Sequence, residues 1–370
     1  MHRAVLAGTL ATFALMLLSA VAVTAGQLPA AGPYKLLSPI THGNLTIFPV
    51  VSSNSHDTSE FLTLDEGIRS GEVIVTEAGS LHGLVRRRPQ PQVYHGGAEV
   101  NRLVLVNNSR RPLVLLAGEV VTGGKQDRVV AKDRIVPPES DPVDLSVFCV
   151  EPGRWVESSA KFDTHASVMA QPSVRKRAMV DADQGKVWDE VNSAKATMAS
   201  RLAAASPGVS AGEYASSTIE LSGTTSYGKL RENAAVKKQV EAITGPMQKS
   251  YESVVRQLRN QNAVGVVVAV KGRLVWADIF ASNSLLSKYW PKLLQSYAAE
   301  ALTASGAGGQ ARIKDAQRFL TDWEARHETV DSEPGLYRQR ELKGDGFRAF
   351  ELTSLLPAAN FDLHLSKMAE

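Results

Sequence analysis

A hairpin in the second half of this 370-residue chain constrains its fold more than any other feature. Its first run, Val264–Val270, reads VGVVVAV, and after a Lys271-Gly272 turn its second run reads RLVWADIF. A strand that is apolar on both faces lies inside a sheet, with a partner strand on each side. We therefore expect the hairpin at 265–280 to complete a sheet begun by the N-terminal half, so that residues 38–280 form one unit.

The patterns along the chain are typical of an α+β fold, and 44% hydrophobic with 21% charged residues is ordinary for a globular protein. We predict a signal peptide at 1–25, a linker at 26–37, one globular domain at 38–356 and a tail at 357–370. Within the domain, the segments are β-rich at 38–160, helical at 187–260, a hairpin plus helices at 263–327, and a terminal hairpin at 336–353.

Short-range signals predict several boundaries. Thr63 and Glu66 have the T-x-x-E spacing of a capping box, which starts a helix, and Gly71 suits its end. The turn residues Asn107-Asn108-Ser109 predict a hairpin between strands at 100–106 and 112–116.

Small residues and prolines shape the predicted helical part. The segment 203–228 is rich in Ala, Ser, Gly and Thr, which predicts a mobile excursion. Pro246 is expected to kink or split an amphipathic helix at 231–260, and Pro291 to open a second segment within 284–302.

The N-terminus has the layout of an export signal. His2 and Arg3 precede the apolar run Ala4–Val23, and Val23-Thr24-Ala25 offers small residues for cleavage. A retained membrane anchor is the alternative, because the run approaches the ~20 residues needed to span a bilayer. We expect cleavage after Ala25 and a secreted or periplasmic protein, with no membrane span after the signal is removed.

Charge and histidine placement argue against several ligand classes. Removal of the signal lowers the basic residues from 41 to 40, against 38 acidic residues, which gives little electrostatic attraction to nucleic acid. The eight histidines are scattered without the spacing of a zinc site. The sequence therefore predicts no nucleic-acid partner, no metal site and no cofactor.

Polar functional groups concentrate in Leu113–Trp155, between and beside two apolar runs. The predicted recognition surface is the Gly118–Arg134 loop, with Glu151 and Arg154 beside it. The residues expected to bind a ligand are Lys125, Gln126, Arg128, Glu151 and Arg154, and the candidate catalytic residues are Glu119 and Asp127.

The sequence Gly123-Gly124-Lys125-Gln126 resembles part of a phosphate-binding loop. Gln126 stands where that motif has a magnesium-binding hydroxyl, so the full motif is absent. The glycines are compatible with an anion held by backbone N–H groups, with Lys125 and Arg128 as counter-charges. A tight loop whose charges face water is the alternative.

The carboxylates Glu119, Asp127, Asp133 and Glu151 are compatible with acid–base chemistry, which needs two carboxyl groups in different environments. Structural salt bridges to nearby arginines are the alternative. Arg154-Trp155 similarly suits either a stacking platform for a ligand or a structural role, with the indole over the core.

Cys149 is the one cysteine of the chain, so an internal disulfide is impossible. It would act as a nucleophile only if a base such as His165 lowered its pKa. The alternation of Leu145, Val147 and Cys149 within an apolar run instead favours a buried structural thiol.

Several blocks, in order, resemble a known family. The blocks are LTLDEGIRSGEVIVTE, GEVVTGGKQDR, IVPP, CVEPGRW, and VVVAVKGRLVWADIF followed by YWPKLLQSYAAEAL. They are similar to the bacterial ARG and rhodanese-phosphatase-superfamily-associated domain, a family of unknown function, over roughly 37–302. The family name implies association with ADP-ribosylglycohydrolase and rhodanese-phosphatase proteins, and so ADP-ribose or phosphoryl chemistry nearby.

Three functions fit these observations. The first is a cell-envelope protein that binds a small anionic ligand or an envelope protein through the Gly118–Arg134 loop. The second is a hydrolase of a phosphorylated or ADP-ribosyl compound, with Glu119 or Asp127 as general base and Lys125 and Arg128 stabilising anionic oxygens. The third is a structural scaffold without a ligand.

Overall fold

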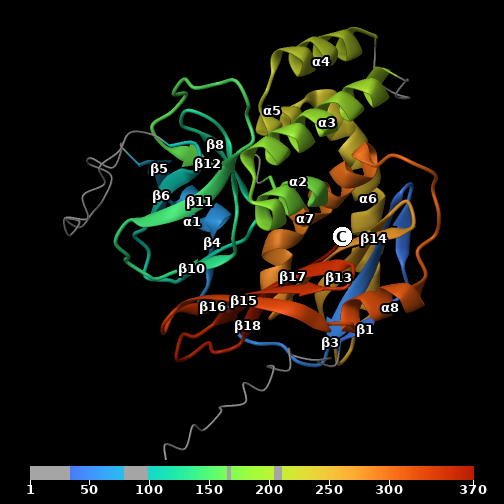
Figure 1. Ribbon diagram of the computed structural model, residues 1–370. Coiled ribbons are helices and arrows are strands. Elements are labelled where there is room, and N and C mark those ends of the chain that lie inside the picture. The colour runs from blue at the N-terminus through green and yellow to red at the C-terminus, as the bar shows by residue number, and fades with distance from the viewer. Residues whose placement is uncertain (1–33, 79–98, 165–167, 204–210) are drawn as a thin grey trace, which may run out of the picture.

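The computed structural model describes residues 34–78, 99–164, 168–203 and 211–370 (Figure 1). The predicted signal peptide lies outside these residues, as does most of the predicted linker. The described strands form three sheets, and most of the helices lie beside the largest of them. The chain is an α+β protein with a β-rich N-terminal half.

The hairpin that constrains the fold lies inside the largest sheet. β13 (Asn262–Val270) pairs antiparallel with β3 (Leu45–Ser52) on one side and with β14 (Arg273–Phe280) on the other. Lys271 and Gly272 connect the hairpin with φ of 50° and 80°, the left-handed conformations that a tight two-residue turn requires. An N-terminal strand and the later hairpin therefore share one sheet, as predicted.

Helices on both faces of this sheet explain why β13 is apolar throughout. Val266 and Val268 belong to the same buried cluster as the residues of α7 (Asn283–Thr303). Val267 alternates to the other face and packs in the cluster that includes α8 (Ile313–Thr321). Successive side chains of a strand point to opposite faces, so both sets are buried.

The rest of the large sheet comes from two short N-terminal strands and four C-terminal strands, in the order β1-β3-β13-β14-β18-β17-β16-β15, with β2 beside β3. The bounds are Lys35–Leu36 (β1), Ile40–His42 (β2), Ala325–Glu333 (β15), Tyr337–Gly344 (β16), Phe347–Ser354 (β17) and Asp362–Ala369 (β18). β16 and β17 pair with each other at the position of the predicted terminal hairpin. Residues 357–370, expected to be a tail, instead contain β18, which lies between β14 and β17.

The other strands of the N-terminal half form two smaller sheets, β10-β7-β4 and β12-β8-β9-β11-β6-β5 (Figure 1). The bounds are Leu62–Thr63 (β4), Val73–Glu77 (β5), Arg102–Asn107 (β6), Leu113–Leu115 (β7), Val120–Gly123 (β8), Arg128–Val130 (β9), Arg134–Val136 (β10), Val143–Cys149 (β11) and Phe162–Asp163 (β12). The hairpin expected between 100–106 and 112–116 is wrong, because β6 and β7 join different sheets. The buried Asn107 side chain donates hydrogen bonds to the Arg111 and Pro137 carbonyls at 2.8 and 3.0 Å. These bonds stabilise the segment that leads from β6 in one sheet to β7 in the other.

The helices are α1 (Leu64–Ser70), α2 (Pro172–Lys176), the π-helical turn Arg177–Asp181, α3 (Gln184–Ala203), α4 (Ala211–Gly223), α5 (Tyr227–Glu232), α6 (Ala234–Arg256), α7 and α8. The Thr63–Glu66 capping box and the left-handed Gly71 bound α1 as predicted. The segment 203–228, expected to be a mobile excursion, contains α4. α6 and α7 each run without a break through Pro246 and Pro291, so neither helix is split. None of the helices in the described ranges is both long and apolar enough to cross a bilayer.

A buried chain of charged side chains joins the smaller sheets to the large one. His364 on β18 lies with Nδ1 2.6 Å from Asp133 and Nε2 3.2 Å from Asp278. Arg175 of α2 donates two hydrogen bonds to Asp278, at 2.9 and 3.1 Å, and the Tyr297 hydroxyl donates a further one. Because buried charges are costly unless they are paired, these contacts fix how the sheets meet.

Candidate functional site

The loop between β8 and β9 is shaped by two glycines with positive φ. Gly123 and Gly124 have φ of 127° and 47°. A Cβ on Gly124 would lie 2.3 Å from the Phe162 ring and 2.8 Å from a carboxylate oxygen of Glu77. The Lys125 backbone N–H donates to that Glu77 carboxylate at 2.9 Å. The backbone N–H that follows the glycines is therefore held by the protein's own carboxylate, which removes it from anion binding.

Asp127, Glu151 and Arg154 meet at the end of this loop. Glu151 accepts a hydrogen bond from the Asp127 backbone N–H at 3.0 Å and one from Arg154 at 2.6 Å. The same Arg154 nitrogen lies 3.6 Å from the Asp127 carboxylate. The Ser226 hydroxyl, at the N-cap of α5, also donates to Asp127. Two sequence blocks and a helix start thus converge on one carboxylate.

Asp127 and Arg154 have shifted pKa values. Burial, followed by the charge of Glu151, raises the pKa of the Asp127 carboxyl, although hydrogen bonds and Arg154 oppose the shift. The hydrogen bond to Glu151 raises the pKa of the Arg154 guanidinium. Asp127 is therefore a carboxyl group that exchanges its proton closer to neutrality than an exposed aspartate, as acid–base catalysis requires.

A cavity of about 380 Å³ opens beside this cluster. Its lining carries carboxylates, cations and hydroxyl groups: Thr122, Gly123, Asp127, Arg154, Ser158, Ser159, Lys161, Asp163, Gly228, Lys229 and Glu232. Lys161 and Lys229 are exposed and make no ion pair with the part of the chain that the structure describes. A second cavity of about 520 Å³ also includes Lys229 and Glu232 in its lining. The space therefore continues past α5.

Lys125, Gln126 and Arg128 do not line this cavity, although the sequence groups them with Asp127. The Lys125 ammonium and the Arg128 guanidinium lie 5.1 and 6.0 Å from the centre of the Trp155 ring. Trp155 is 43% exposed, so it is not a cap over the core. Of the sequence-derived residues, Asp127 and Arg154 thus line the cavity, whereas Lys125 and Arg128 lie beside Trp155.

Arg128 is buried, and only some of its N–H groups have hydrogen-bond partners. Its Nη1 donates to the Gln126 carbonyl at 2.7 Å, and its Nη2 lies 4.0 Å from Glu77. Its Nε and Nη2, one oxygen of Glu77 and the side-chain oxygen of Gln126 have no hydrogen-bond partner among the described residues. Buried polar atoms of this kind usually contact ordered water or a small polar ligand.

Glu119 lies in a different place from the cavity. Its carboxylate accepts a hydrogen bond from Lys292 of α7 at 2.5 Å and one from the Leu116 backbone at 2.7 Å. Lys292 also pairs with Asp65 at 2.8 Å, and both Glu119 and Lys292 are buried. Asp133 is likewise held by His364. These two carboxylates thus form salt bridges with a distant lysine and a distant histidine, whereas the expected pairing with a nearby arginine occurs at Asp127 and Glu151.

Cys149 is free and fully buried. Burial raises the pKa of its thiol, which disfavours the reactive thiolate. The histidine considered as its base, His165, lies outside the described residues. Cys149 is therefore a buried structural thiol, as the alternation of its strand predicted.

Sequence reasoning missed Ser226, Lys161 and Lys229. The S-Y-G-K order at 226–229 carries a recognisable helix cap, since the Ser226 hydroxyl accepts the Lys229 backbone N–H at 3.0 Å. Nothing local indicates that this cap also contacts Asp127. No group of three or more potential metal ligands occurs within the described ranges.

Comparison with known proteins identifies the family. No curated protein and no solved structure matches the chain. One family model does, that of the ARG and rhodanese-phosphatase-superfamily-associated protein domain, over residues 33–367. The match covers nearly the whole chain, including both sequence blocks that meet at Asp127 and Arg154. The chain therefore belongs to the ARG and rhodanese-phosphatase-superfamily-associated protein domain family, whose function is unknown.

Proposed function

We propose that this protein is an exported, cell-envelope protein that binds a small anionic ligand in the cavity beside Asp127 and Arg154. The observation that carries the proposal is the convergence of Arg154, Lys161 and Lys229 on one polar space of about 380 Å³. Binding sites for small molecules are concave and hold a few convergent polar groups. The N-terminal sequence supports export, because it has the charge, apolar run and small residues of a cleaved signal.

The lining combines three cations with three carboxylates and several hydroxyl groups, which suits a ligand that carries both an anionic group and hydroxyl groups. Arg154 is already paired with Glu151, so the attraction comes chiefly from Lys161 and Lys229. Ser158, Ser159 and Thr122 offer hydroxyl donors and acceptors, and Asp163 and Glu232 offer acceptors for ligand hydroxyls. A phosphorylated sugar or an ADP-ribosyl compound has this combination of groups.

Hydrolysis of such a compound is the second candidate function, and the position of Asp127 favours it. The carboxyl group lines the cavity, its pKa is raised by burial, and the Ser226 hydroxyl orients it. Asp127 would remove a proton from an attacking water, and the lysines would stabilise the charge that develops on the ligand oxygens. Glu119 has no part in this proposal, because its carboxylate is paired with Lys292 elsewhere.

A thermal-shift series tests binding. The full mature chain would be heated with inorganic phosphate, a hexose phosphate or ADP-ribose at matched ionic strength. A ligand present at 100 times its Kd stabilises the folded state by about 2.7 kcal/mol and so raises the melting midpoint. A panel with no shift at millimolar concentration would refute the proposal.

Two further measurements separate the remaining points. For hydrolysis, the wild-type chain should release product from a bound compound, and Asp127→Asn should still bind the compound but release no product. Unchanged turnover in that variant would exclude Asp127 as the general base. Mass spectrometry of protein recovered outside the cytoplasm should give a chain that begins at Gly26. Retention of residues 1–25 would contradict cleavage of the signal.

A further inference from the structure

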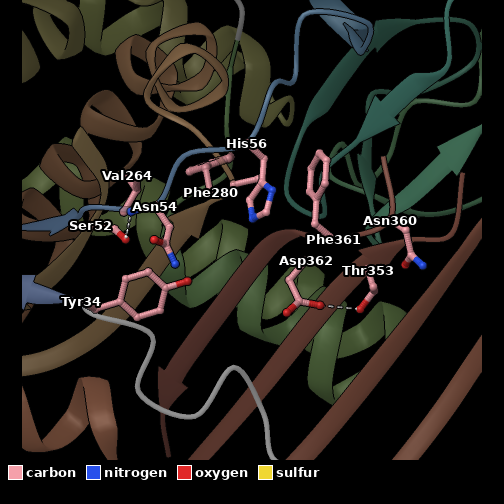
Figure 2. Close-up of a pocket in the computed structure, with 11 residues that line it drawn as sticks. Tyr34, Ser52, Asn54, His56, Val264, Phe280, Thr353, Asn360, Phe361 and Asp362 are labelled. Atoms are coloured by element: carbon pink, nitrogen blue, oxygen red, sulfur yellow. Dashed lines mark hydrogen bonds between the residues drawn. The ribbon is translucent and has the colours of Figure 1, made fainter. Parts of the chain in front are cut away.

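Another cavity lies on the large sheet, and none of its described lining residues lines the cavity beside Asp127 or the one next to α5. It encloses about 330 Å³ where the end of β3, the end of β14 and the connection from β17 to β18 meet. Figure 2 shows the side chains of Tyr34, Asn54, His56 and Asp362 directed toward a common space. They come from three stretches of the sequence, at residue 34, at residues 54–56 and at residue 362, so the cavity is a product of the sheet order.

The lining is aromatic on several sides. The rings of His56 and Phe361 stack with centroids 4.3 Å apart and planes at 15°. Phe61 supports Phe361 from behind in an edge-to-face contact at 6.5 Å. Tyr34 and Phe280 add two further rings to the wall. Aromatic faces carry partial negative charge, so such a wall attracts cations.

The charged groups of this lining differ from those of the cavity beside Asp127, where three carboxylates accompany three cations. Among the described residues that line it there is one carboxylate, Asp362, and neither lysine nor arginine. The Asp362 carboxylate accepts a hydrogen bond from the Thr353 hydroxyl at 2.8 Å, which fixes its direction without neutralising it (Figure 2). Burial, followed by the charges of Asp362 and Glu351, raises the pKa of Tyr34 to about 12. Asp362 is therefore the counter-charge that the lining offers to a cation.

We propose that this cavity binds a small organic ammonium ion. Asp362 supplies the counter-charge, the Asn54 amide and Ser52 hydroxyl supply hydrogen-bond acceptors, and the Tyr34 and Phe361 rings contact the alkyl groups of the cation. A carboxylate within a ring-lined space is the combination that recognises alkylated or primary ammonium groups. An anion is disfavoured because the described lining has no lysine or arginine, and its one imidazole, that of His56, stacks on the Phe361 ring.

The test uses tetramethylammonium chloride as the probe, with sodium chloride of equal ionic strength as the blank. Calorimetric titration into the full mature chain should give saturable, one-site binding. Asp362→Asn keeps an acceptor for Thr353 and removes the charge, and we expect it to weaken binding at least tenfold. Lys161→Ala, in the first cavity, is the matched control and should leave binding unchanged.

Two outcomes would overturn this proposal. One is that tetramethylammonium shows no saturable binding, or that it binds Asp362→Asn as tightly as the wild type. The other is binding of a neutral sugar such as glucose in place of the cation, which would indicate a hydroxyl-recognising site. If Asp362→Asn does not fold, Tyr34→Ala replaces it and should weaken binding severalfold, whereas Tyr34→Phe keeps the ring and should not.

Discussion

Arg154 Nη2 lies 3.6 Å from the Asp127 carboxylate, and the two residues come from separate blocks of the sequence. The same nitrogen donates to Glu151 at 2.6 Å. One partly exposed guanidinium thus serves two buried carboxylates at the wall of the cavity. This relationship joins the stability of the loop to the electrostatics of the site.

Arg154→Ala should destabilise the folded protein. Both Asp127 and Glu151 would remain buried while losing their common counter-charge, and breaking a buried pair in this way costs about 3–5 kcal/mol. The partial exposure of Arg154 should reduce this cost to about 1–3 kcal/mol. Urea unfolding at pH 7 measures it. Arg69→Ala, an exposed arginine at the end of α1, should cost less than about 0.5 kcal/mol; an equally small loss in Arg154→Ala would contradict the assignment.

Lys292→Met should be more damaging than Arg154→Ala. It leaves the buried Glu119 and the mostly buried Asp65 without their shared cation, which is expected to cost about 3–5 kcal/mol. Adding Glu119→Gln removes one of the unpaired charges, so the double variant should be less unstable than the sum of the single changes. Strict additivity in a double-mutant cycle would show that the pair does not interact.

The pH dependence of the free energy of unfolding should reveal the loss of a proton from His364. Burial disfavours its charged form, but Asp133 and Asp278 outweigh burial and raise its pKa to about 9. Between pH 6.5 and 9 the folded state therefore binds a proton that the unfolded state has released, so the free energy of unfolding falls as pH rises. The full loss is on the order of 3 kcal/mol.

Lys367 acts in the opposite direction at higher pH. Burial lowers its pKa to about 8, so from pH 8 upward the unfolded state binds the extra proton and stability rises with pH. Burial also raises the pKa of Glu351 to about 7, which adds to the fall in stability in this window, so the test uses Glu351→Gln as its background. In this background, chemical unfolding from pH 6.5 to 8 should give a negative slope when His364 is present and a flat profile in His364→Gln. A negative slope that persists in the variant would assign it to another group.

Local signals predicted the elements that depend on neighbouring residues. The α1 boundaries follow from Thr63, Glu66 and Gly71, which satisfy the backbone groups of one helical turn. The turn of the β13–β14 hairpin follows similarly from Lys271 and Gly272. These contacts span a few residues, so their pattern is complete within a short stretch.

Elements that depend on distant partners were not predictable. β18 has polar residues at positions that are buried, because His364 pairs with Asp133, 231 residues away. The segment of α4 has the small residues of a loop, yet it forms a helix beside α3 and α6. A sequence pattern contains no record of such partners.

The same distinction applies to the candidate site. Asp127, Glu151 and Arg154 were predicted because they stand in two dense polar blocks joined by one connection. Lys161 and Lys229 were not, because an isolated surface lysine has no distinguishing pattern. The close approach of α5 to the loop, shown by the contact of Ser226 with Asp127, brings Lys229 to the cavity.

Calorimetric titration with a hexose phosphate tests the anion-binding function most directly. The wild-type chain should show saturable one-site binding that weakens as salt concentration rises, since the lysines are exposed. The Lys161→Ala/Lys229→Ala double variant should bind at least tenfold more weakly. Lys249→Ala, an exposed lysine on α6, should bind as the wild type does. Binding that is equally strong in the double variant and the wild type, or no binding at all, would contradict an anion site in this cavity.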